Sequence, residues 1–177
     1  MTQPELATSA RSEYYEQYWH DLPLQDSPHL RWKAARTLEH PAVLAARSLI
    51  DVGCGSGYML KLLERPGLRR VGIEVSQSAV ENLRSHGIEG EVVDLENGHL
   101  PFADGTFDVA LCYDVLEHLF APWAQLREIS RCLAPPHAVA VGQVIDALWG
   151  PAQGVVYASN LQAGSLIKTT NDGRGTP

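Results

Sequence analysis

The sequence has few cysteines, no long apolar run and more acidic than basic residues, and each of these features excludes a class of protein. The three cysteines, Cys54, Cys112 and Cys132, show no C-x-x-C spacing, so neither a zinc site nor a disulfide framework is predicted. Thiols inside apolar or glycine-rich runs behave as small hydrophobes and fit a reducing cytoplasm. With 21 acidic and 14 basic residues, the net charge of −7 argues against nucleic acid as the main partner.

Membrane and secretion signals are also missing from the sequence. No apolar run approaches the length needed to cross a bilayer, and residues 1–10 lack the cationic start and apolar stretch of a signal peptide. We therefore expect a cytoplasmic protein without a membrane partner. The composition carries no information on its oligomeric state.

The length of 177 residues suits one domain with a sizeable core. We divide it into an N-terminal helical cap (1–46), a cofactor-binding core (47–145) and an irregular C-terminal segment (146–177). In the cap, residues 1–10 are expected to be disordered, and helices are predicted over 12–20 and 30–39. In the last segment, two stretches have strand character and either form a β-hairpin or belong to a partly unstructured tail, 155–158 and 165–168.

Strand and helix patterns alternate from residue 47 onward. Apolar runs bounded by turn residues predict five strands, over 48–52, 70–74, 91–94, 107–112 and 138–141. Helical spacing predicts helices over 58–64, 77–85 and 123–133, the last of them ended by Pro135-Pro136. This alternation is typical of a doubly wound, Rossmann-like α/β fold, a parallel sheet with helices on both faces.

Four aromatic residues have helical spacing within the predicted helix 12–20, namely Tyr14, Tyr15, Tyr18 and Trp19. Aromatic stripes on a short helix favour packing against a core. The alternative is a flap that closes over a ligand pocket.

The first predicted strand ends in a loop of the form Asp51-x-Gly53-x-Gly55-x-Gly57. Glycine lets the backbone turn sharply and approach a ligand closely, and the following helix N-terminus offers free N–H groups to an anion. Ligands of open α/β sheets bind at the carboxyl ends of the strands. Asp51 can therefore attract the ammonium group of a ligand, although such a loop alone serves several nucleotide cofactors.

A second acid narrows the choice of ligand. Glu74 ends the next strand, 23 residues after Asp51, where doubly wound folds place a carboxylate for ribose hydroxyls. A third acid, Asp94, also ends its strand and can receive an adenine amino group. The glycines run Gly-x-Gly-x-Gly and not the Gly-x-Gly-x-x-Gly that cradles a pyrophosphate, which disfavours NAD.

At this point the sequence resembles class I S-adenosylmethionine-dependent methyltransferases of type 11. The resemblance covers about residues 47–135 and rests on five ordered segments: 49–57, 71–76, Asp94-Leu95, 100–109 and 114–119. Part of it is also similar, more loosely, to the methyltransferase-like protein of methionine biosynthesis.

The resemblance implies S-adenosylmethionine as the cofactor and gives site residues their roles. Asp51 and the loop of Gly53, Cys54, Gly55 and Gly57 would hold the methionine part. Glu74 would bind the ribose, Val75 would pack on the adenine, and Asp94 with Leu95 would meet its edge. Backbone at Cys112 or Tyr113 would complete the amino-acid side.

Methyl transfer to a small molecule is the function that the resemblance implies. It is an in-line displacement, and a base is required only if the acceptor must lose a proton early. His118 is the candidate base, among the neighbouring Tyr113, Asp114 and Glu117. The alternative is that His118 only caps or packs a short helix.

Two departures from the family pattern keep other functions open. Ala134-Pro135-Pro136-His137 replaces a Pro-Gly-Gly turn, and only 33 residues follow Val144, so we expect shortened C-terminal strands. A non-catalytic, cofactor-binding partner or regulator is therefore the alternative to an enzyme. An NAD-linked oxidoreductase is a third hypothesis, which the glycine spacing disfavours.

Overall fold

The computed structural model describes residues 3–20, 28–142, 156–160 and 165–169 of the chain. Its helices are α1 (Gln3–His20), α2 (Pro28–Leu38), α3 (Pro41–Ala45), α4 (Tyr58–Leu62), α5 (Gln77–Ser85) and α6 (Pro122–Arg131), with 3-10 turns η1 (Leu95–Asn97) and η2 (Leu116–His118). Its strands are β1 (Ser48–Val52), β2 (Arg69–Glu74), β3 (Glu89–Val92), β4 (Phe107–Tyr113), β5 (Leu133–Gly142), β6 (Val156–Asn160) and β7 (Ser165–Thr169).

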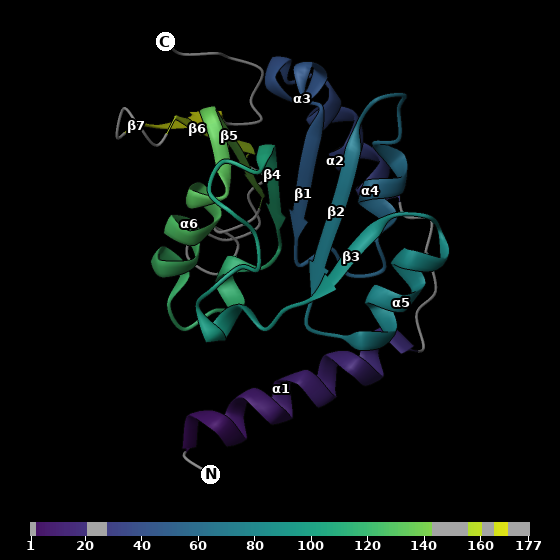
Figure 1. Ribbon diagram of the computed structural model, residues 1–177, viewed down its shortest axis with the longest axis vertical. Coiled ribbons are helices and arrows are strands. Elements are labelled where there is room, and N and C mark those ends of the chain that lie inside the picture. Colours follow the sequence, from purple (N-terminus) through teal and green to yellow (C-terminus); the bar gives the residue numbers. More distant parts are fainter. Residues whose placement is uncertain (1–2, 21–27, 143–155, 161–164, 170–177) are drawn as a thin grey trace.

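The strands form one sheet in the order β3-β2-β1-β4-β5-β6-β7 (Figure 1). The first five strands are mutually parallel, and β6 and β7 are added antiparallel at the edge. The order reverses between β1 and β4, which is the switch point where doubly wound sheets bind ligands. The predicted Rossmann-like α/β fold is thus confirmed.

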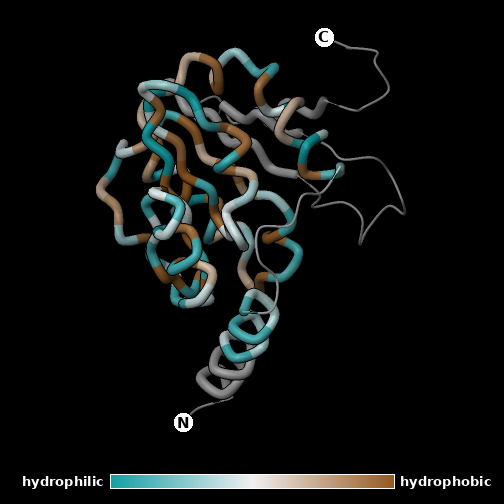
Figure 2. The backbone as a smooth tube through the Cα atoms, turned by 90° about the vertical axis from the view of Figure 1, so that its right-hand side faces the viewer, coloured by the Kyte–Doolittle hydropathy of each residue, from teal (hydrophilic) through white to brown (hydrophobic). Residues whose placement is uncertain are grey.

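Apolar side chains of alternate strand residues fill both faces of the sheet. Leu49, Val109 and Leu111 pack with Ala34 of α2, whereas Ile50 and Val52 pack on the opposite face with Ile129 of α6. This follows from the two-residue period of a strand whose two faces are both covered. In Figure 2 the central strands are accordingly the most hydrophobic part of the backbone.

Helix α1 differs from its sequence-based expectation in two ways. It begins at Gln3, so residues 3–10, which were expected to be disordered, are helical. It also crosses the edge of the sheet at which β1, β2 and β3 end (Figure 1). Tyr14 and Tyr18 are 62% and 44% exposed, so the aromatic stripe is not a core element, because α1 lies over the sheet edge and not against a sheet face.

Two strand boundaries were predicted wrongly. The third strand is Glu89–Val92 and not 91–94, because Asp94 instead caps η1, its Oδ1 accepting a 2.9 Å hydrogen bond from the Glu96 N–H. The fifth strand begins at Leu133, so the two prolines lie inside it. They are tolerated because the register jumps between the pairs Phe107–Leu133 and Val109–Ala138, and such a bulge needs no ladder hydrogen bond from proline.

The segments with strand character near the C-terminus are paired antiparallel as β6 and β7, with Val156 opposite Thr169. Each strand has five residues. None of the helices that the structure describes combines the length and the apolar character needed to cross a membrane.

Candidate functional site

The glycine loop leaves β1 in a backbone conformation that favours glycine. Gly53 and Gly55 have φ of 72° and 52°, in the left-handed region that a Cβ disfavours. A Cβ on Gly53 would overlap Val115, and one on Gly55 would lie 2.5 Å from the Trp19 ring. The helix after the loop, α4, has only five residues, so the expected anion site at its N-terminus has little support.

Glu74 joins the end of β2 to this loop. Its side chain is buried, with Oε2 accepting a 3.0 Å hydrogen bond from the Gly55 N–H and Oε1 a 2.8 Å bond from the Val75 N–H. Burial raises the pKa of this carboxyl, although the backbone donors oppose the shift. Glu74 is therefore an organiser of the loop as well as a candidate ligand residue.

Asp51 lies on β1, buried behind the loop. Burial raises the pKa of its carboxyl to about 7, the nearby Glu74 carboxylate adds to the shift, and the Lys33 ammonium opposes it. Because the pKa of Asp51 lies near neutral pH, a cationic ligand group beside it would keep the carboxyl ionised. This electrostatic setting suits the predicted role of Asp51 toward an ammonium.

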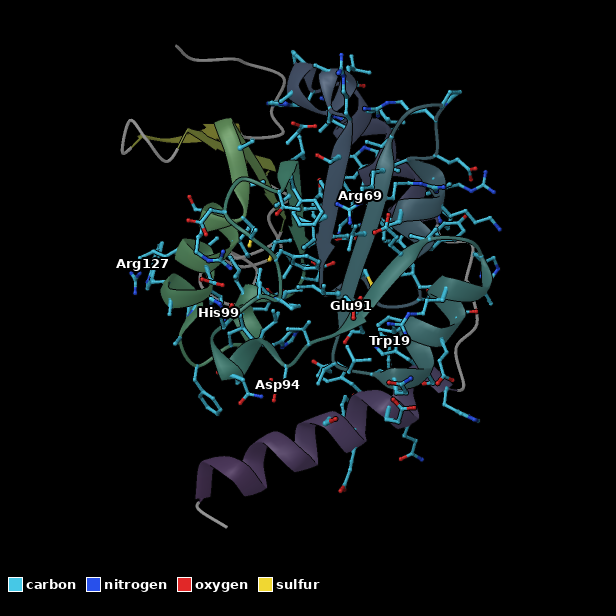
Figure 3. The ribbon with its side chains drawn as sticks, viewed as in Figure 1. Trp19, Arg69, Glu91, Asp94, His99 and Arg127 are labelled. Carbon is cyan, nitrogen blue, oxygen red and sulfur yellow. The ribbon has the colours of Figure 1, made fainter. Side chains whose placement is uncertain are left out.

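A cavity of about 110 Å³ opens at the carboxyl ends of the strands. Of the residues predicted to bind the cofactor or to act as the base, six line it: Gly53, Glu74, Val75, Asp94, Leu95 and His118. The other predicted site residues do not line the cavity: Asp51, which is buried, and Cys54, Gly55, Gly57 and Tyr113. Figure 3 shows Asp94 on the side of the sheet that faces α1.

The C-terminal part of α1 closes this cavity. Tyr15 and Trp19 line it, and the Trp19 indole lies against Gly55. The Glu16 carboxylate holds α1 in place, since it accepts hydrogen bonds from the Ser76 hydroxyl at 2.8 Å and the Ser78 N–H at 3.1 Å. Of the two interpretations of the aromatic stripe, the flap describes Tyr15 and Trp19 better.

A second group of residues, on α2, was missed by the sequence analysis. Lys33 is 4% exposed and forms an ion pair with Asp114, while the Thr37 and Tyr113 hydroxyls lie 2.7 Å apart. Asp114 has φ of 57°, the only positive value of a non-glycine residue among those described. A lysine on a helix with no acidic partner nearby in the chain gives no sequence signal for this arrangement.

His118 ends η2 and is exposed at the cavity wall. Its backbone N–H donates to the Val115 carbonyl at 2.9 Å within η2, and its side chain is exposed. A base role for His118 stays a prediction.

Comparison with known proteins gives these features a family context. Residues 50–140 match the family described as "Methyltransferase domain". The chain is 32% identical over 111 residues to a ubiquinone biosynthesis O-methyltransferase of Thiobacillus denitrificans, covering 60% of this chain and 46% of that protein. It is 25% identical over 103 residues to the enzyme of that name from Acinetobacter baylyi, covering 55% and 43%. The matches thus span less than half of these relatives.

Solved structures show the same fold. The cyclase SpnF is 28% identical with a TM-score of 0.56, over 63% of this chain and 44% of that one. A SAM-dependent methyltransferase from Aquifex aeolicus is 23% identical with a TM-score of 0.55, over 67% and 68%. The family match covers half of the chain, from Ile50 in β1 to Ala140 in β5, and so includes the carboxyl ends of β1 to β4. This chain therefore belongs to the methyltransferase domain family, whose cofactor is S-adenosylmethionine.

Proposed function

We propose that this chain transfers a methyl group from S-adenosylmethionine to a small-molecule acceptor. The observation that carries the proposal is the cavity at the switch point, where Glu74, Val75 and Asp94 form one wall. Two carboxylates flanking an apolar residue suit an adenosine, which has a vicinal diol, a flat ring and an amino group.

The residues of this wall fit the adenosine part. Each Glu74 oxygen accepts one backbone N–H and keeps a lone pair for a ribose hydroxyl. Asp94 uses one oxygen to cap η1, which leaves the other as an acceptor for the adenine amino group. The half-buried Val75 offers an apolar surface to the ring.

The methionine part would extend past Gly53 toward Asp51. In the structure the Trp19 indole lies against Gly55 on this path. A ligand that reaches Asp51 along the loop must therefore displace the indole, either by rotation of the Trp19 side chain or by a shift of α1. The surface of α1 supports such a shift, because the rings of Tyr14 and Tyr18 on this helix are exposed and not packed in the core.

When bound, the cofactor supplies an electrophilic methyl group on a sulfonium, which an acceptor in line with the bond can take. The protein would place the acceptor along the wall formed by Val115, His118 and Leu119, next to Tyr15. For a hydroxyl or amine acceptor, the accessible His118 ring would take the proton. The two ubiquinone biosynthesis relatives are O-methyltransferases by name, which supports an oxygen acceptor.

Calorimetric titration with S-adenosylhomocysteine tests cofactor binding. We expect binding by the wild type and loss of about 1.5–3 kcal/mol of binding free energy in Glu74→Ala, because a charge-assisted contact in a buried site disappears. Glu91→Ala is the matched control, since it removes an equal charge from an exposed side chain on β3. No binding at millimolar ligand, or binding of NAD instead, would exclude the proposal.

Transfer must be measured separately, because the similar fold of SpnF belongs to a protein named a cyclase. We would incubate the protein with the cofactor carrying a labelled methyl group and with metabolite extracts, and identify the acceptor by its mass shift. His118→Gln should slow transfer to a hydroxyl or amine while leaving S-adenosylhomocysteine affinity unchanged. Binding without transfer to any fraction would favour the non-catalytic partner.

A further inference from the structure

Lys33 is a buried cation beside the ligand cavity that no part of the proposed function uses. Its side chain is 4% exposed, on the face of α2 that packs on the sheet. A free ammonium is costly to bury, so its contacts should explain its position. The charged partner that it contacts is Asp114, which follows β4 directly and lines the cavity.

The same face of α2 also holds the last residue of β4. Thr37, one turn after Lys33, lies 2.7 Å from the Tyr113 hydroxyl, and the Lys33 ammonium lies 5.5 Å from the centre of the Tyr113 ring. Asp114 adopts a left-handed conformation, with φ of 57°, which is unfavourable for a residue with a Cβ. The ion pair offsets this cost and fixes the direction in which the chain enters the cavity wall.

Asp51 shares this side of the sheet. It is two residues from Leu49, which packs in the cluster that contains Ala34 of α2, so its side chain points to the α2 face. The charged groups that act on Asp51 are Glu74 from β2, Asp114 after β4 and Lys33 from α2. The two carboxylates disfavour its ionised form, and Lys33 is the cation that favours it.

Three further titratable groups of the described residues interact with Asp51, and all three are neutral near pH 7. Burial raises the pKa of the Cys54 and Cys112 thiols and raises that of Tyr113 to about 12, so these groups stay neutral near pH 7. The Glu117 carboxyl, on η2, interacts electrostatically with Lys33 and Asp114. The charged groups that act on the ionisation of Asp51 are therefore the Glu74 and Asp114 carboxylates and the Lys33 ammonium.

We propose that Lys33 is a positioning residue for the cofactor site, which holds Asp114 in its left-handed conformation and keeps Asp51 available as a carboxylate for the ammonium of the ligand. The inference rests on the proposed function. It assigns Lys33 an action through Asp51 and Asp114, not a contact with the ligand.

The pH dependence of S-adenosylhomocysteine binding tests this role. Calorimetry between pH 6 and 9 should show that wild-type affinity rises through pH 7 as Asp51 ionises. In Lys33→Met the midpoint should move upward by about one pH unit, so that affinity is about fivefold weaker at pH 7 and nearly restored at pH 9. Lys33→Arg should keep the wild-type midpoint.

Arg36→Met is the matched control, because it removes the same charge from the exposed side of α2 and should leave the midpoint unchanged. If Lys33→Met does not fold, Lys33→Met/Asp114→Asn removes both partners and should still raise the midpoint, since Lys33 affects Asp51 more than Asp114 does. An unchanged midpoint, or an equal loss of affinity at every pH, would overturn the inference. Absence of wild-type binding at every pH would instead refute the proposed function.

Discussion

The Glu74 carboxylate accepts a 3.0 Å hydrogen bond from the backbone N–H of Gly55, so one side chain connects the end of β2 to the glycine loop. Its other oxygen accepts from Val75 at 2.8 Å. The candidate ribose ligand is thus also a structural support of the loop that it faces. Substitutions at this position should act on stability as well as on binding.

Glu74→Ala should lower the free energy of unfolding by about 1–3 kcal/mol, because the Gly55 and Val75 N–H groups lose their acceptor. Glu74→Gln keeps one acceptor oxygen and should remain closer to the wild type. Urea unfolding of the free protein at pH 7 measures both. Equal stability of Glu74→Ala and the wild type would show that the carboxylate does not hold the loop.

Asp51 should make the protein less stable as pH rises toward neutrality. Its pKa is raised by burial from 3.8 to about 7, so the native state binds this proton more tightly than the unfolded chain. The resulting stabilisation is full below about pH 4 and is lost as pH rises to about 7. Asp51→Asn should flatten this part of the profile in urea unfolding at a series of pH values. A slope identical to that of the wild type would contradict the assignment.

Trp19→Ala should tighten binding of S-adenosylhomocysteine. The indole lies against Gly55, and its displacement costs the contacts of a large aromatic side chain, so removing it should improve affinity by up to about tenfold. Isothermal titration of the variant gives the change directly. Tyr14→Ala removes an exposed ring from the same helix and should have no effect. Weaker binding by Trp19→Ala would mean that the indole packs on the ligand and is not displaced by it.

Gly53→Ala should destabilise the fold more than Gly67→Ala does. Both residues have positive φ, 72° and 79°, and an alanine in this region costs roughly 1–2 kcal/mol. A Cβ on Gly53 would also overlap Val115, whereas nothing lies within 4 Å of one on Gly67. The difference between the two unfolding free energies isolates the packing at the cavity. Equal values would show that Val115 moves aside without cost.

Local sequence patterns predicted the elements that build the core of the sheet. The strand 48–52 and the helix 77–85 were found with the same bounds in the structure, since apolar period, glycines and the Ser76 cap are local signals. The cap is formed as expected, with the Ser76 hydroxyl accepting from the Ala79 N–H at 3.1 Å. The predicted bounds of β3 and β5 were wrong. Asp94 caps η1 and does not end a strand, and Pro135 and Pro136 lie within β5, because the pairing of β5 with β4 is irregular there.

Candidate site residues were predicted by the same local logic. Glu74, Asp94 and Gly53 each stand at or just beyond a strand end, and parallel strands bring such positions to one edge of the sheet. No comparable local signal exists for Glu16, because its partners, Ser76 and Ser78, are about 60 residues away in the chain. A helix that lies across the site carries the same apolar stripe as a helix that packs in a core.

The sequence by itself determined the α/β alternation, the glycine loop and the order of its acids, because turn residues and strand period act over a few neighbouring residues. Only the tertiary structure decided that Lys33 is paired with Asp114, 81 residues away, and that Trp19 lies on Gly55. These contacts join residues that are far apart in the sequence, so they form only when the chain folds. An exposed lysine is solvated by water, whereas the buried ammonium of Lys33 requires a charged partner, which is the Asp114 carboxylate.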